Sequence, residues 1–339
     1  MILNIVWIIL GVALVMWGAD KLTEGASKLA RLADIPEIII GLTIVAAGTS
    51  APELFVSMTS ALKGTSDLAV GNVIGSNIFN TMLIVGCSAL VAPLAVSKQT
   101  VSKDIPFAII ASLLLFLLCF DDMDSPHLWG NEITRSDGIL LLIGFAAFMI
   151  YTLYAARKSG EWNPSEGDTL NKWDPDKPDD DESEQSDGGK LTIWVNIGWI
   201  VIGLVCLIVG SDLFVDAASW VAHRFGIRQS VIGLTIVAGG TSLPELATSV
   251  VAARKGQSAL AIGNALGSNV FNILLILGLT SVVSPLRIMG ITIVDLTVML
   301  LSIVLVWMFA YTKYRVSRRE GALLVLGFIA YMGWLFYLL

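Results

Sequence analysis

Two glutamates stand in the middle of apolar stretches, each directly after a proline, in the segments GTSAPE and GTSLPE that end at Glu53 and Glu245. Proline has no N–H to donate to the carbonyl four residues earlier. The carbonyls of Gly48 and Gly240 are therefore expected to lack their helical hydrogen bonds. Free carbonyls and carboxylates are oxygen ligands that suit hard cations, so the two segments predict a cation site.

Each glutamate has a hydroxyl one helical turn before it. Thr49 precedes Glu53 by four residues, and Thr241 precedes Glu245 by the same spacing. If the turn stays helical, the hydroxyl and carboxylate oxygens share one face. Two similar clusters of oxygen ligands are therefore expected.

A polar stripe follows each of these segments in an otherwise apolar stretch. Its members recur every fourth residue: Asn72, Ser76 and Asn80 after the first segment, and Asn264, Ser268 and Asn272 after the second. They supply oxygen and amide groups without Cys or His, which suits Na+, Ca2+ or Mg2+ and disfavours Zn2+ or Cu+. We expect Asn72 and Asn264 to pin neighbouring helices rather than to bind ions.

The composition indicates that lipid surrounds most of the chain. Hydrophobic residues make up 55% of the 339 positions and charged residues 14%, whereas soluble domains carry about 25% charge. About ten stretches reach the roughly 20 apolar residues of a membrane-spanning helix, and they lack the alternation of a β-barrel. We predict an all-α membrane protein of about ten transmembrane helices. A charge at mid-span costs at least about 2.5 kcal/mol, so Glu53 and Glu245 are expected to be functional.

The chain contains an internal duplication. Residues 41–86 align without a gap to residues 233–278, with 29 of 46 positions identical, including Gly, Thr, Ser, Pro, Glu and Asn in one register. We therefore divide the chain into a first five-helix repeat (1–157), a linker (158–190) and a second five-helix repeat (191–339). Because five is odd, the second repeat enters the membrane from the opposite side, as in many transporters with a site near the midplane.

Basic residues indicate the orientation. With the N-terminus placed outside, the inside loops hold 16 Lys and Arg and the outside loops 5, and cytoplasmic loops usually carry the excess. Both termini are then outside, and the linker, which holds 11 acidic residues between Glu161 and Asp187, is cytoplasmic. The expected location is a plasma membrane, in particular a prokaryotic inner membrane.

The motifs G-T-S-x-P-E-L and G-N-x-x-G-S-N-x-F-N, present in both halves, resemble the two alpha repeats of the cation/Ca2+ antiporter superfamily, specifically prokaryotic sodium/calcium exchangers. The resemblance implies ten helices around several Na+ positions and one Ca2+ position, reached alternately from the two sides. Ca2+ and Na+ would be the substrates and the bilayer the surroundings, without cofactor, nucleic acid or obligate protein partner.

The same resemblance implies roles for individual residues. Glu53 and Glu245 would bridge Ca2+ and Na+, and the remaining oxygens would come from Thr49, Thr241, Ser50, Ser242, Ser76, Ser268 and the carbonyls of Ala46 and Ala238. Asn80 and Asn272 would line the centre. Some family members have Asp where this chain has Asn272, which makes the potassium-dependent branch a poorer match.

Three functions other than Na+/Ca2+ exchange are compatible with parts of the sequence. In a Ca2+/H+ antiporter, protonation of the two glutamates replaces Na+ binding, although protons need no cage of Thr and Ser oxygens. An enzyme is disfavoured because HExxH, GxSxG and Cys/His pairs are missing from the sequence. A Ca2+ sensor that binds through residues 174–187 is disfavoured because they lack the ligand spacing and Gly of an EF-hand.

Overall fold

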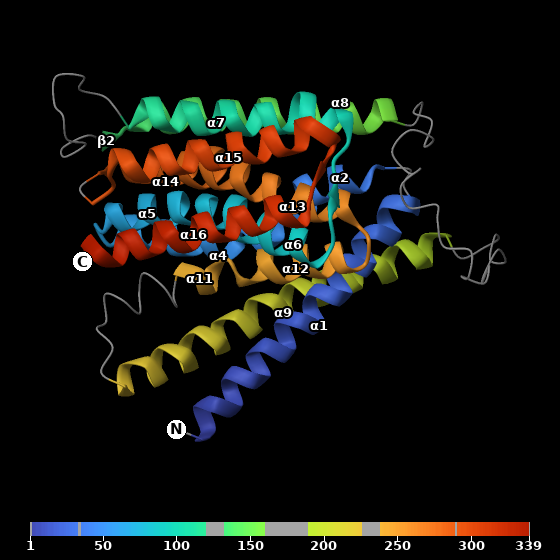
Figure 1. The fold of residues 1–339 in the computed structure, drawn as a ribbon, viewed down its shortest axis with the longest axis horizontal. Helices are drawn as coiled ribbons and strands as arrows, with labels where there is room; N and C mark the ends of the chain where they lie inside the picture. Colours follow the sequence, from blue (N-terminus) through green and yellow to red (C-terminus); the bar gives the residue numbers. More distant parts are fainter. Residues whose placement is uncertain are drawn as a thin grey trace.

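A computed structural model of the chain describes residues 2–32, 35–119, 132–159, 189–225, 238–288 and 290–338. Nearly all of its elements are helices that run side by side (Figure 1). The first half consists of α1 (Ile2–Leu32), α2 (Glu37–Ile40), the π-helical η1 (Gly41–Val45), α3 (Ala46–Thr49), α4 (Ala51–Leu62), α5 (Ser66–Ile78), the π-helical η2 (Phe79–Ile84), α6 (Val85–Val91), β1 (Leu94–Ala95), the π-helical η3 (Thr100–Asp104), α7 (Ile105–Leu118), β2 (Glu132–Ile133) and α8 (Arg135–Ser159).

The second half repeats this order. It consists of α9 (Gly189–Arg224), α11 (Ala238–Thr241), α12 (Leu243–Arg254), α13 (Ser258–Val270), the π-helical η7 (Phe271–Ile276), α14 (Leu277–Val283), β3 (Leu286–Arg287), α15 (Ile293–Lys313), β4 (Arg315–Val316) and α16 (Arg318–Leu338). From α3 to β1 and from α11 to β3, every element starts and ends at the same repeat position in the two halves. The predicted two-repeat, all-helical architecture is confirmed.

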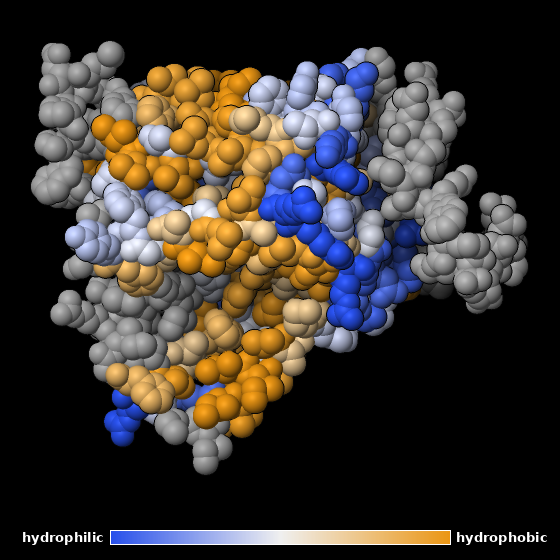
Figure 2. Space-filling view, viewed as in Figure 1, coloured by the Kyte–Doolittle hydropathy of each residue, from blue (hydrophilic) through white to orange (hydrophobic). Residues whose placement is uncertain are grey.

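The described residues include eight helices long and apolar enough to cross a membrane. A ninth span is formed if the bent pair Glu37–Thr49 and Ala51–Leu62 counts as one. In the second half, residues 226–237 lie outside the described residues, and the helices equivalent to α3 and α4 are α11 and α12. Large apolar side chains such as Phe55 and Trp194, both 69% exposed, point away from the bundle, and Figure 2 shows broad apolar areas on the outer face of these helices.

The two halves interlock. Strand β1 pairs with β4 and β2 pairs with β3, so each short sheet has one strand from each half. The last helix of each half also packs on the other half: α16 on α6, where Gly86 meets Gly321, and α8 on α14, where Gly138 meets Gly278. Each half therefore completes the other.

Helices α1 and α9 form a separate crossed pair (Figure 1). Glycines recur every seven residues at their crossing, and a Cβ added to Gly18 would lie 2.7 Å from the carbonyl oxygen of Gly203. At one end the pair lies against α12, while at the other end both helices splay away from the rest of the bundle. We call the end where α8 stops and α9 starts the linker end; the pair is splayed at the opposite end.

Candidate ion-binding site

The two predicted proline segments are helix breaks. Ser50 and Ser242 interrupt the helices with φ, ψ of −83°, 7° and −91°, 8°, and the first copy bends by 46° at this point. A new helix starts directly after each serine, so Glu53 and Glu245 lie in the first turn of α4 and α12. The free N–H groups at a helix N-terminus favour negative charge, which offsets part of the cost of burying a carboxylate.

The structure joins each glutamate to the serine of the other half. Ser50 donates its hydroxyl to Glu245 Oε1 at 3.0 Å, and Ser242 donates its hydroxyl to Glu53 Oε1 at the same distance. Both carboxylates are buried, with exposed fractions of 0% and 1%. The two helix breaks thus face each other across the interface between the halves.

The serines of the polar stripe extend this cluster. Ser76 Oγ accepts the hydroxyl of Ser242 at 3.2 Å. Ser268 donates its hydroxyl to Glu245 Oε1 at 3.5 Å. The structure therefore brings these two predicted serines into hydrogen-bond contact with the groups around the glutamates.

The threonines behave differently from the helical expectation. The helix breaks at Ser50, between Thr49 and Glu53, so the turn that would place them on one face does not stay helical. Instead Thr49 donates its hydroxyl to the carbonyl of Val45 at 3.1 Å, within its own half. Thr49 also lies 3.2 Å from Asn264 Oδ1. Thr49 thus contacts the other half, and Thr241 occupies the equivalent position at the end of α11.

The two predicted alanine positions start the equivalent helices α3 and α11. The carbonyl of Ala46 accepts the N–H of Ser50 at 3.0 Å and the hydroxyl of Thr49 at 3.4 Å. Ala238 occupies the same repeat position at the start of α11.

Four asparagines form a second pair of contacts between the halves. Asn80 donates its amide to Asn269 Oδ1 at 3.1 Å, and Asn272 donates to Asn77 Oδ1 at 3.5 Å. Asn77 and Asn269 are not among the predicted site residues. Their signal was present, because both belong to the G-S-N part of the duplicated motif, one helical turn before Asn80 and Asn272.

The remaining stripe residues have the structural role expected of them. Asn72 donates to the carbonyl of Glu53 at 3.3 Å and to Ser57 Oγ at 3.0 Å. Asn264 donates to the carbonyl of Glu245 at 3.2 Å and to Ser249 Oγ at 2.9 Å. These two amides pin α5 to α4 and α13 to α12 beside the breaks.

Four buried oxygens at this site receive no hydrogen bond from any described residue. They form two repeat-related pairs: Glu53 Oε2 with Glu245 Oε2, and Asn80 Oδ1 with Asn272 Oδ1. An unpaired buried acceptor is costly, and a cation bound between such oxygens would satisfy them. Within the described ranges, no three His, Cys, Asp or Glu side chains gather in one place. Any bound cation would therefore meet two carboxylates and neutral oxygens.

Helix α9 covers the site on one side. Ser211 donates its hydroxyl to the carbonyl of Gly240, which is one of the two carbonyls that the prolines were predicted to free. The equivalent residue of α1 is Ala19, which has no hydroxyl to offer Gly48. Gly48 packs against Leu204 and Gly240 against Val215, both on α9. The two halves of the site are thus covered unequally.

The chain matches known proteins over almost its whole length. A family model described as sodium/calcium exchanger protein matches residues 3–154 and 195–337. The chain is 37% identical over 340 residues to CaxA of Alkalimonas amylolytica, with 99% of each chain covered, and 31% identical over 350 residues to the sodium/calcium exchanger MaX1 of Methanosarcina acetivorans, again covering 99% of each. The solved structure of the sodium-calcium exchanger NCX_Mj soaked with 10 mM Na+ superposes with a TM-score of 0.79 at 28% identity and covers 98% of both chains.

Proposed function

Because this chain belongs to the sodium/calcium exchanger protein family, we propose that it carries Ca2+ in exchange for Na+ through the site between the two helix breaks. The observation that supports this most directly is the set of four buried oxygens that have no donor among the described residues, two from Glu53 and Glu245 and two from Asn80 and Asn272. The oxygens of Thr49, Thr241, Ser50, Ser242, Ser76 and Ser268 and the carbonyls of Ala46 and Ala238 would complete the Na+ positions.

Charge balance explains why exchange would be obligatory. Two carboxylates neutralise one Ca2+ or two Na+, so the loaded site is nearly neutral with either ion. An empty site would carry two uncompensated charges in a low-dielectric interior, which costs several kcal/mol or more. Only a loaded site would then pass between the two sides of the membrane.

Exchange of Ca2+ against H+ is the second candidate. It is favoured by the isolation of the two carboxylates from any basic side chain: the salt bridges of the described residues all involve Asp20 or Glu24. The hydroxyls that surround both glutamates support Na+ instead, because they are ligands that a proton does not need.

Ion gradients separate these two functions. We expect proteoliposomes loaded with Na+ to take up 45Ca, and liposomes loaded with an equal concentration of K+ to take up none. Uptake that follows a pH gradient in the absence of Na+ would show that H+, and not Na+, is the exchanged ion. If neither gradient drives uptake, Ca2+ is the wrong substrate.

We further propose the division into repeats at 1–157 and 191–339, with 158–190 as a cytoplasmic linker and both termini outside. The excess of Lys and Arg on the loops of the linker side supports it. A cysteine placed in the linker should react with a membrane-impermeant maleimide only when the cytoplasmic side is accessible.

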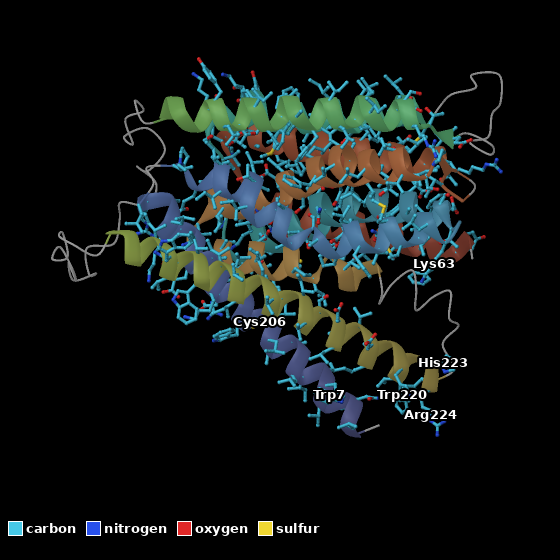
Figure 3. The ribbon with its side chains drawn as sticks, turned by 180° about the vertical axis from the view of Figure 1, so that it is seen from behind. Trp7, Lys63, Cys206, Trp220, His223 and Arg224 are labelled. Carbon is cyan, nitrogen blue, oxygen red and sulfur yellow. The ribbon has the colours of Figure 1, made fainter. Side chains whose placement is uncertain are left out.

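One ion pair of the described residues joins α1 to the C-terminal end of α12. At the linker end, Lys255 Nζ lies 2.7 Å from Asp20 Oδ1, 2.9 Å from the carbonyl of Asp20 and 3.1 Å from Thr23 Oγ1. The repeat equivalents of these two residues are Lys63 and Asp212, and they form no salt bridge within the described residues. Helix α9 likewise makes no contact with α4 comparable to that of α1 with α12, and Figure 3 shows Lys63 apart from the end of α9.

Alternating access would exchange these two ion pairs. In the state open toward the linker end, we expect Lys63 to approach Asp212 and Lys255 to leave Asp20. The double variant K63C/D212C should therefore form a disulfide under turnover conditions with Na+ and Ca2+, and the disulfide should block uptake until it is reduced. Each single variant controls for pairing with Cys87, Cys119 or Cys206. Absence of the cross-link under every ion condition would contradict the exchange of ion pairs.

A further inference from the structure

A basic pocket lies at the linker end, away from the ion site. It has a volume of about 340 Å³ and is lined by Pro93, Lys313, Arg315, Ser317, Arg318 and Arg319. In Figure 2 this region is the hydrophilic patch over the turn between α15 and α16, directly beside the apolar surface of the helices. Four cationic side chains therefore surround one cavity.

The positive charge of the basic pocket is not balanced by the residues that the structure describes. None of the four cations forms a salt bridge with a carboxylate of the described residues. Arg318 donates to the carbonyl of Val91 at 3.1 Å. The neighbouring acid, Glu320, is engaged in a helix cap, where its Oε2 accepts the N–H and the hydroxyl of Ser317 at 2.7 and 2.8 Å.

The backbone around the pocket is fixed by several contacts. Tyr314 ends α15 in the left-handed conformation, with φ 50° and ψ 34°, which turns the chain so that Arg315 pairs with Ala95 in the two-stranded sheet. The carbonyl of Tyr314 also accepts the N–H of Val96 at 2.8 Å. The cations thus project from a constrained turn.

Aromatic residues place the pocket at the level of the lipid headgroups. Tyr311 and Tyr314, which are 63% and 45% exposed, lie on either side of Lys313 in the sequence. The rings of Trp307 and Tyr311 contact each other at a tilt of 50°, with centroids 5.7 Å apart. Tyr and Trp concentrate where the hydrocarbon of a bilayer meets water, and basic pockets between helix ends at this depth suit anionic headgroups.

We propose that the basic pocket binds the phosphate headgroup of an anionic phospholipid. The guanidinium groups of Arg315, Arg318 and Arg319 suit the oxygens of a phosphodiester, and the acyl chains of the same lipid would lie along the apolar surface beside the pocket. Free phosphate shares the headgroup's chemistry but would gain nothing from that apolar surface. The site is independent of the transported ions.

Lipid binding can be measured without transport. The probes are dioleoylphosphatidylglycerol and dioleoylphosphatidylcholine, titrated onto the detergent-solubilised full chain and counted by native mass spectrometry. The variant K313Q/R315Q/R319Q removes three pocket charges and keeps Arg318, which contacts the backbone. Each cation near a membrane surface contributes roughly a fivefold gain in affinity, so this variant should bind phosphatidylglycerol about a hundredfold more weakly.

A matched variant separates the pocket from general charge. R31Q/K103Q/R254Q removes three exposed cations of the same side of the protein that do not line the pocket, and it should bind phosphatidylglycerol like the wild type. The single variant R319Q, with an expected loss of about fivefold, serves if the triple variant does not fold. Equal losses in the two triple variants, equal binding of phosphatidylcholine, or displacement of the lipid by millimolar inorganic phosphate would each overturn the proposal.

Discussion

The variant E53Q is expected to lose Na+-driven Ca2+ uptake almost completely, by about a hundredfold or more. Glutamine keeps the shape of the side chain but removes one of the two charges that a divalent cation would meet between Glu53 and Glu245. Breaking a buried charge pair costs about 3 to 5 kcal/mol, and 2.7 kcal/mol already corresponds to about a hundredfold in affinity. Uptake of 45Ca by proteoliposomes with an outward Na+ gradient measures the loss.

The stability of E53Q distinguishes a lost ligand from a damaged fold. Without ions, the variant should melt at the same temperature as the wild type or higher, because it buries one uncompensated charge fewer. Added Ca2+ should raise the melting temperature of the wild type and leave that of E53Q unchanged, since only binding to the folded state stabilises it. The control is E37Q in the preceding helix α2, which should transport normally. Normal uptake by E53Q would remove Glu53 from the site.

The variant G203A is expected to have the second-largest effect, through the crossing of α1 and α9. A Cβ at Gly203 would lie 2.8 Å from both the carbonyl oxygen of Gly18 and the backbone nitrogen of Leu22. Backbone atoms cannot move aside cheaply, and such overpacking typically costs about 1 to 3 kcal/mol. We expect a lower melting temperature and a transport rate reduced at least about tenfold, with the midpoint for Ca2+ binding unchanged because Gly203 lies at the crossing of α1 and α9 and not at the ion site.

Gly198 provides the control on the same helix. A Cβ added there meets nothing within 4 Å, so G198A gains the helix propensity of alanine, up to about 1 kcal/mol, without a clash. G198A should therefore be at least as stable as the wild type and should transport normally. If G203A and G198A behave alike, the close approach of α1 and α9 has no part in transport.

The sequence was sufficient to predict the repeats and the breaks. Duplication over 46 positions cannot arise from apolar composition alone, and Pro52 and Pro244 remove helical hydrogen bonds wherever the helices lie. The positions of Glu53 and Glu245 after these breaks followed directly. Local rules of this kind apply before tertiary structure is known.

Contacts between the halves could not be predicted in the same way. The hydroxyl of Ser50 meets Glu245 rather than the nearby Glu53, and no rule of spacing along the chain relates residues 195 positions apart. The expected sharing of one face by Thr49 and Glu53 depended on an unbroken helix, and the break at Ser50 removed that condition. Asn77 and Asn269 were missed because a helix with several polar positions does not reveal which of them face the other half.

The interlocked packing of the halves has a consequence for how the protein is made. Gly86 of α6 is covered by Gly321 of α16. Gly321 is synthesised about 235 residues after Gly86. At synthesis rates of about 5 to 20 residues per second, this surface waits roughly 10 to 50 seconds for its partner. During that interval the newly inserted first half sits in the bilayer with its packing surface facing lipid, so its survival depends on insertion factors and quality-control proteases tolerating an unassembled intermediate.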